Sequence, residues 1–238
     1  MAGKFIKGAL VELMPTFLVP VPKVIAFQYN PETMTHTWTQ AETSSGKEQG
    51  SPNPLAVSGL PGESFSFTLM MDAKDPIADR RGATSTIAAK TGIYSRLAAL
   101  EMLLYPTDTS NGGLLGSVSV SVGTSGISAS VSATAGVKST IPQSQVPTVL
   151  FVWGAGRIVP VRVTTLTITE KLYDERLNPT HAEAQIGLRV LTAGELNSVT
   201  GGSGSLAKVS YTYTQALRQA LAIADLANAN ESIGLLPI

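Results

Sequence analysis

The strand predicted at residues 181–190 constrains the fold most strongly, because apolar and polar residues alternate along it without a break. The apolar positions are Ala182, Ala184, Ile186, Leu188 and Val190. The intervening positions are Glu183, Gln185, Gly187 and Arg189. Successive side chains of a strand point to opposite faces of the sheet. The pattern therefore predicts a sheet with one face packed on a core and the other in contact with solvent.

This strand is the second arm of a long hairpin within residues 148–192, in which a short strand and a turn at Gly154-Ala155-Gly156 come first. On the outgoing strand Val159, Val161 and Val163 share one face, whereas Leu166 and Ile168 have the opposite parity. A phase change near Thr164 and Thr165 fits a β-bulge, and a twist or a change of packing partner fits it as well. A turn over 173–180 joins the long strands. Such a hairpin is the wall of a barrel, half of a sandwich, or an edge that awaits a neighbouring subunit.

Composition narrows the class of protein. The chain has 238 residues, enough for one large domain or two small ones. Its 17 basic and 17 acidic residues give a formal net charge of zero, so we do not expect a nucleic-acid partner. Without cysteine there is no disulfide, thiolate metal site or cysteine nucleophile. We see no secretory signal and no apolar run that spans a bilayer, so we expect a cytoplasmic protein without a membrane span.

The rest of the chain supplies shorter elements. Alternation predicts strands at 6–13, 23–28, 34–39 and 63–72, with a long polar loop at 40–61. An apolar stripe at helical spacing predicts a helix over 92–105 that packs on the dry face of the sheet; the stripe consists of Ile93, Leu97, Leu100 and Leu104. The expected fold class is therefore mainly β with α.

Two segments have unusual composition. Residues 107–147 are rich in Ser, Gly, Thr, Ala and Val, and are interpreted as an insertion that is either a flexible loop or a small β-arm. Residues 194–205 contain GGSGS and predict a linker after a first unit at 1–193. A C-terminal extension at 206–238 follows, with an Ala-rich helix over 211–230 and an apolar tail.

Several phrases resemble the tube-type domain of contractile injection systems, the family of phage tail-like machines. They are Phe27-Gln28-Tyr29-Asn30-Pro31, Phe65-x-Phe67-x-Leu69, Phe151-Val152-Trp153-Gly154, Glu170-Lys171-Leu172-Tyr173 and His181-Ala182-Glu183-Ala184. They occur in the family's order and cover most of residues 5–193. The hairpin tip departs from the family pattern, because no Arg precedes Ala182. No peptidoglycan-binding LysM phrase follows, so that activity is not carried over.

The resemblance implies a tube-protein-like β-barrel or sandwich and a structural role in a sixfold ring. With one such domain and a C-terminal helix, the chain is more similar to the baseplate tube initiator, or adaptor, than to the repeating inner tube subunit. Implied partners are further copies, the inner tube protein, the spike or hub protein and other baseplate components. Glu183, Gln185 and Arg189 would line the lumen. Expected interface residues are Phe27, Asn30, Pro31, Trp153, Gly154, Tyr173, Asn178 and Pro179.

Signals for catalysis are weak, and we expect neither enzymatic activity nor a cofactor or metal. His36 and His181 are interpreted as surface or interface residues. Residues 154–157 (GAGR) lack the glycine spacing of a dinucleotide fingerprint and predict a hairpin turn. Asp72 and Asp75 flank a strand end and predict turn residues. A free β-sandwich binding or hydrolytic domain remains the alternative from another class.

Overall fold

The computed structural model describes residues 6–14, 21–40, 55, 57, 59–74, 90–105, 117–123, 126–132, 146–199 and 201–226. Its centre is a seven-stranded antiparallel sheet in the order β2-β1-β7-β8-β9-β4-β3. The strands are β1 (Ala9–Met14), β2 (Val21–Ala26), β3 (Met34–Thr39), β4 (Gly62–Asp72), β7 (Thr148–Val152), β8 (Ile158–Tyr173) and β9 (Pro179–Val190). The mainly β class with α that the sequence predicts is thus confirmed.

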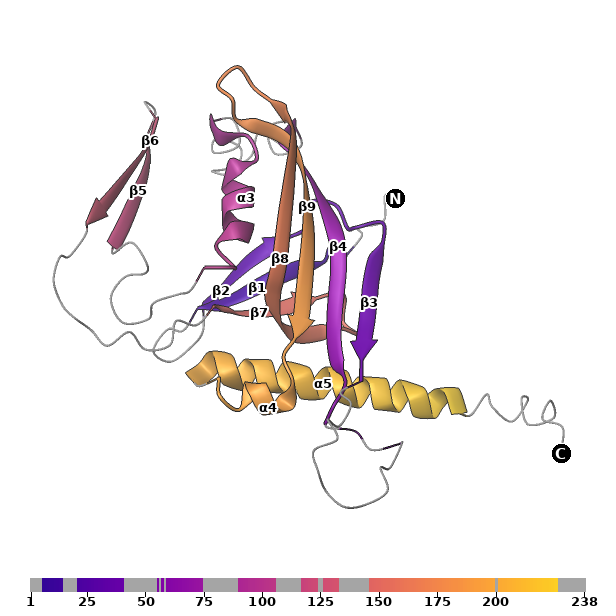
Figure 1. Ribbon diagram of the computed structural model, residues 1–238. Coiled ribbons are helices and arrows are strands. Elements are labelled where there is room, and N and C mark those ends of the chain that lie inside the picture. The colour runs from indigo at the N-terminus through magenta and orange to yellow at the C-terminus, as the bar shows by residue number, and fades with distance from the viewer. Residues whose placement is uncertain are drawn as a thin grey trace, which may run out of the picture.

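The sheet curls on itself, because β8 changes partner along its length. Residues Ile158–Val161 pair with β7, and Val161–Tyr173 pair with β9. In Figure 1, β1, β2 and β7 cross behind β8 and β9 at a steep angle. Phe65 of β4 and Phe151 of β7 are separated by two strands in the sheet order, yet their ring centroids are 5.2 Å apart. The core is therefore enclosed between the two halves of one sheet.

The predicted dry face and bulge are both confirmed. All five apolar residues of β9 are buried, as are Val159, Val161 and Val163 of β8. The register shifts between Val163 and Thr165, after which Leu166 and Ile168 pack against the same core. The bulge moves the apolar parity by one residue, and this keeps the strand facing the core along most of its length.

Helix α3 (Tyr94–Glu101) contributes Leu97 and Leu100 to the core, together with the flanking Ile93 and Leu103. It is anchored where Gly92, at φ +56°, passes the end of the hairpin, and Ile93 N donates to Pro179 O at 2.8 Å. A Cβ on Gly92 would lie 2.1 Å from Pro179 O, so only glycine fits this crossing. The prediction that the helix packs on the dry face of the sheet is confirmed.

The predicted Gly/Ser linker is wrong for residues 201–205, which begin the long helix α5 (Gly201–Leu226). The short helix α4 (Ala193–Leu196) precedes it, with a capping box between Thr192 and Glu195. A Cβ on Gly204 would lie 2.1 Å from Val199 O, so this glycine permits a tight turn between helices. The helix also begins ten residues before the predicted 211, and residues 227–238, with the apolar tail, lie outside the described part.

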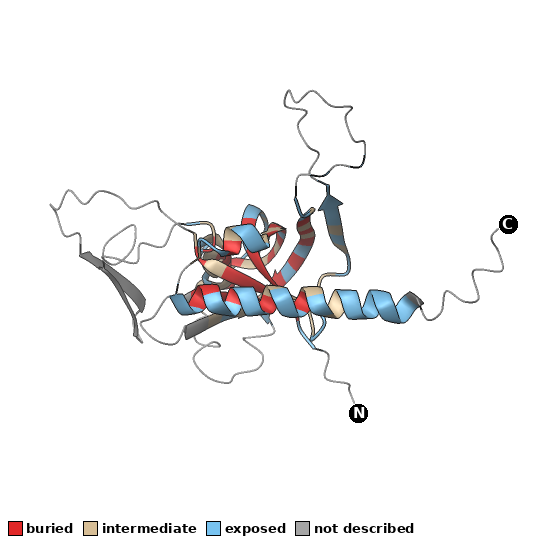
Figure 2. Ribbon diagram, turned by 90° about the horizontal axis from the view of Figure 1, so that it is seen from below, coloured by how far each residue is buried: buried red, intermediate tan, exposed pale blue. Residues whose placement is uncertain are grey.

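Helix α5 lies across the lower ends of the strands (Figure 1). Its buried side is made of small residues, Ser203, Gly204, Ala207, Ser210 and Thr214, and contacts β7 and β8. Figure 2 shows these positions along the first part of the helix, whereas its last turns extend beyond the body and are exposed. Small side chains allow the helix axis to approach the sheet closely.

Within the low-complexity insertion, β5 (Ser117–Gly123) and β6 (Gly126–Ser132) form an antiparallel hairpin. The β-arm interpretation therefore holds for these residues. The remainder of 107–147 up to residue 145, most of the loop at 40–61, and Asp75 lie outside the described residues.

Candidate assembly surface

The outer side of the hairpin forms a polar face across four neighbouring strands. The registers align its side chains in rows: Arg162-Arg189-Ser64-Thr37, Thr165-Gly187-Ser66-Thr35, Thr167-Gln185-Thr68 and Thr169-Glu183-Met70. These residues are exposed or half-buried, whereas the opposite side of β4, of β9 and of the first part of β8 is buried. Most members of the polar face are hydroxyl or amide residues, so the face offers hydrogen-bond donors and acceptors with little net charge.

The three residues that the resemblance places in a lumen all belong to the polar face. Gln185 is exposed, and Glu183 is half-buried and ion-paired with Lys171 of β8. Arg189 donates to Glu195 Oε1 at 2.7 Å. Burial opposes ionisation of Glu195, but hydrogen bonds from Thr192 and Arg189 hold its pKa below its ordinary value. Two charged residues of the polar face, Glu183 and Arg189, are therefore each held by a neighbouring residue of opposite charge.

The candidate interface residues divide between the core and the surface. Phe27 was expected at an interface, but its side chain is buried against Phe67, with ring centroids 5.6 Å apart. For this side chain the prediction is wrong. Pro179 is buried, and Trp153 is half-buried beside Phe27. Tyr173 and Asn30 are exposed, and Pro31, Gly154 and Asn178 are half-buried. The segment at 27–31 therefore contributes Phe27 to the core, while Tyr29 remains exposed.

Side-chain amides in this phrase replace backbone pairing where the sheet comes close to closing. Gln28 Nε2 donates to Asp72 O at 2.9 Å, and Gln28 Oε1 accepts from Asp72 N at 3.0 Å. Asn30 likewise bridges Gly8 N and Ile6 O, both at 2.9 Å. The carboxamide of Gln28 thus ties the segment after β2 to the end of β4, as a neighbouring strand would do. No local pattern in the sequence pointed to this role of Gln28.

A charged cluster lies where α5 crosses β3 and β4, and sequence reasoning missed it. Glu63 is buried and accepts two hydrogen bonds from the Arg218 guanidinium, one at 2.8 Å, while His36 Nε2 lies 2.8 Å from Glu63 Oε1. The Arg218 guanidinium also lies 4.8 Å from the centroid of the Trp38 ring. Burial lowers the pKa of His36 although Glu63 acts to raise it. Because these donors surround the carboxylate, the cluster fastens α5 to the sheet.

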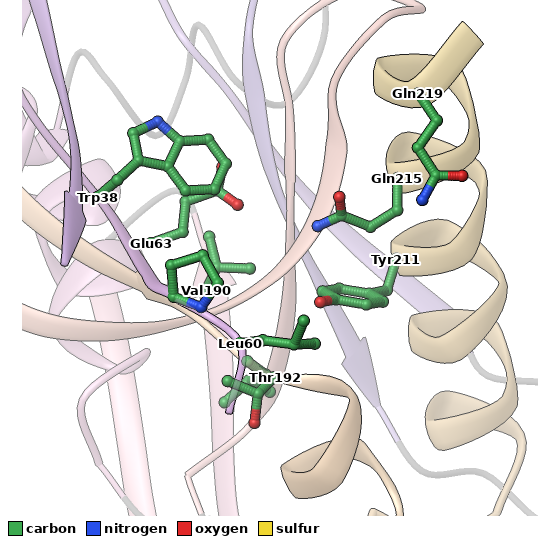
Figure 3. Close-up of a pocket in the computed structure, with 10 residues that line it drawn as sticks. Trp38, Leu60, Glu63, Val190, Thr192, Tyr211, Gln215 and Gln219 are labelled. Carbon is green, nitrogen blue, oxygen red and sulfur yellow. The ribbon is translucent and has the colours of Figure 1, made fainter. Parts of the chain in front are cut away.

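Next to this cluster is a cavity of about 230 Å³, which we call the α5 cavity. Figure 3 shows Tyr211, Gln215 and Gln219 projecting from α5 toward Trp38 and Glu63, with Leu60 and Thr192 below. Pro61, Val190 and Leu191 complete the lining. The lining of the cavity therefore combines apolar side chains with the Glu63 carboxylate and the carboxamides of Gln215 and Gln219.

His181, Asp72 and residues 154–157 make structural contacts. His181 Nδ1 lies 3.5 Å from Asp72 Oδ2, and Asp72 Oδ1 accepts from Lys74 N at 2.7 Å. Residues 154–157 form the predicted hairpin turn, in which Trp153 N donates to Arg157 O at 2.8 Å. Among the described residues, no group of three His, Cys, Asp or Glu side chains is placed to hold a metal ion.

No protein-family model matches the chain, and no curated protein matches it either. In the described part of the chain, no helix combines the length and apolarity needed to cross a membrane.

Proposed function

We propose that this chain is a structural component of a contractile injection system, in which it forms the ring of the baseplate tube initiator or adaptor. The observation that carries the proposal is the polar face: four strands present aligned hydroxyl and amide groups on one side, and three of them, β4, β8 and β9, pack on the core with the other. Such a wall suits a water-filled lumen that molecules pass without binding tightly.

In this role the subunits assemble as a sixfold ring, with Glu183, Gln185 and Arg189 toward the lumen. The sheet ends in two edge strands, β2 and β3. Exposed edges promote pairing with other chains, and closure of a ring covers them. One ring surface meets the spike or hub protein, and the other templates the inner tube protein. The protein is made in the cytoplasm and assembles into a phage tail-like particle, without enzymatic activity.

Helix α5 supplies a further contact surface for other baseplate components. Its outer side carries exposed apolar residues at helical spacing, namely Leu206, Val209, Tyr213 and Ile223. A stripe of this kind on a helix whose last turns extend beyond the body favours a partner surface. The β5–β6 hairpin and α5 both favour the initiator over the alternative, the repeating inner tube subunit.

Quantitative mass spectrometry of particles purified from the source organism tests the proposal. We expect one ring of this chain per particle beside a far more abundant tube protein. A copy number equal to that of the tube would instead favour the repeating subunit. A chain that is absent from particles and purifies as a free monomer would refute assembly. That result would favour the free β-sandwich binding or hydrolytic domain, with the α5 cavity as its pocket.

A further inference from the structure

Arg157 ends the turn between β7 and β8, and its side chain reaches the core. The backbone at this point is fixed, because Arg157 O accepts from Trp153 N at 2.8 Å and Gly154 supplies the positive φ, +69°, that the turn contains. The central guanidinium carbon lies 5.4 Å from the centroid of the buried Phe65 ring. This aromatic contact gives the five N–H donors of Arg157 no oxygen acceptor.

No other group supplies that acceptor either. Within the described part of the chain, the Arg157 guanidinium makes no hydrogen bond and no ion pair. Every other arginine of that part has a side-chain acceptor or is exposed to solvent. Acceptors serve Arg96, Arg189 and Arg218, and the exposed two are Arg162 and Arg176. Arg157 is thus the one described arginine that is half-buried and still lacks an acceptor.

The donors of Arg157 nevertheless remain open to a ligand. Among the described residues, Glu12 Oε2 is the one fully enclosed side-chain polar atom that lacks a hydrogen bond. The guanidinium nitrogens of Arg157 are therefore not sealed inside the core, and an acceptor from outside can reach them.

The charges around Arg157 leave an excess of one positive charge. Those that act on it come from Arg218 on α5 and Glu63 on β4, and His36 on β3 completes the group. The one carboxylate is already engaged, since Arg218 donates to both of its oxygens and His36 Nε2 lies 2.8 Å from Oε1. Burial and the nearby Arg218 lower the pKa of Arg157, although Glu63 acts to raise it. Protonation of His36 would add further positive charge.

This imbalance selects the sign of the ligand. A neutral ligand leaves the excess charge in place, and a cation adds to it, whereas an anion cancels it. A guanidinium binds carboxylate and phosphate groups through two parallel N–H···O hydrogen bonds. Half-burial favours such a pair, because charges attract more strongly where less water screens them.

We propose that Arg157 is the centre of an oxyanion-binding site, at which its guanidinium binds a carboxylate, phosphate or sulfate group. Arg218 adds positive potential, while its own donors stay on Glu63. The oxyanion comes either from a free anion or from an acidic side chain of a second copy, and the two sources share the same chemistry. The inference goes beyond the proposed function and does not rest on it.

Calorimetric titration of the full-length chain with sodium sulfate tests the site. Sulfate is a suitable probe because its charge does not change near neutral pH, and sodium chloride keeps the ionic strength constant so that screening stays the same. We expect saturable binding to the wild-type chain. Arg157→Met keeps the aliphatic stem but removes the donors, and should weaken sulfate binding by about tenfold to a hundredfold.

Two further variants make the comparison specific. Arg162→Met is the matched control, because it makes the same substitution at an exposed arginine of the polar face and should leave the affinity for sulfate unchanged. Arg157→Lys keeps the positive charge without the paired donors, and should retain part of the affinity. Circular dichroism of each variant shows whether its fold is kept, and Arg157→Lys carries the test if Arg157→Met does not fold.

Sedimentation of the wild-type chain distinguishes the two sources of the oxyanion. If an acidic side chain of a second copy fills the site, sulfate competes with it and weakens self-association of the wild-type chain but not that of Arg157→Met. If the natural ligand is a free anion, sulfate binds and self-association is unchanged. Both results support the site.

The absence of saturable sulfate binding to the wild-type chain overturns the inference. Equal affinities of wild-type and Arg157→Met chains, or equal losses in Arg157→Met and Arg162→Met, overturn it as well. None of these results alters the copy number per particle, which tests the proposed function separately.

Discussion

The ion pair between Arg218 and Glu63 gives the sharpest prediction about what holds α5 in place. We expect Arg218→Met to keep the aliphatic stem and remove the guanidinium. The Glu63 side chain, 4% exposed, then retains only His36 as a side-chain partner from the cluster. Removing one partner of a buried pair costs about 3–5 kcal/mol. His36 Nε2 remains 2.8 Å from Glu63 Oε1, and the Arg218 side chain is already 26% exposed. We therefore expect a loss of stability at the lower end of this range, about 3 kcal/mol.

Urea unfolding followed by circular dichroism measures this loss, which corresponds to a fall in Tm of about 6–12 °C for a chain of this size. Arg162→Met is the matched control, because Arg162 is exposed on the polar face, and its substitution should change stability by less than about 0.5 kcal/mol. Glu63→Gln combined with Arg218→Met should recover part of the loss, since no buried charge remains. Equal stability losses for Arg218→Met and Arg162→Met would refute the assignment of Arg218 as the residue that fastens α5 to the sheet.

Three further substitutions probe other parts of the fold. Gly92→Ala, whose Cβ would lie 2.1 Å from Pro179 O, should destabilise the chain by more than about 2 kcal/mol in urea unfolding; a loss below 1 kcal/mol would mean that the crossing relaxes easily. Phe151→Ala removes a fully buried ring from the aromatic core and should lower the free energy of unfolding by about 3–5 kcal/mol. The exposed Thr167→Ala should lower it by less than about 0.5 kcal/mol. Comparable losses in the two variants would contradict the burial of Phe151. Burial lowers the pKa of His36 in the folded state, so the stability of the fold should decline as pH falls below about 6.5. In thermal melts at several pH values, His36→Gln should make Tm depend less on pH in this range. An unchanged dependence would exclude His36 as its source.

Local periodicity accounts for the elements that the sequence predicts well. The strands at 34–39 and 62–72, the β9 alternation and the bulge after Val163 all follow from side-chain parity along a single strand. The dry face was predictable for the same reason, because an alternating strand can bury only one of its sides. Of the candidate lumen residues, all three lie on the polar face, since their position depends on parity alone.

Residues 201–205 show where composition misleads. Glycine and serine are typical of flexible linkers, yet here they begin a helix, because Gly204 permits contact with Val199 and small side chains let α5 approach the sheet. Phe27 shows the same limit: it was expected at an interface, but its side chain fills the core against Phe67.

The sequence by itself determined which residues form strands, which side of each strand is apolar, and that one hairpin carries a polar face. Those properties depend on neighbours two to four positions apart, which a single chain displays directly. Only the tertiary structure decided that β8 bends the sheet around its core, that Gln28 bridges to Asp72, and that Arg218 reaches Glu63 across a separation of 155 residues. Contacts of that kind depend on how whole elements pack, and no local pattern in the chain encodes them.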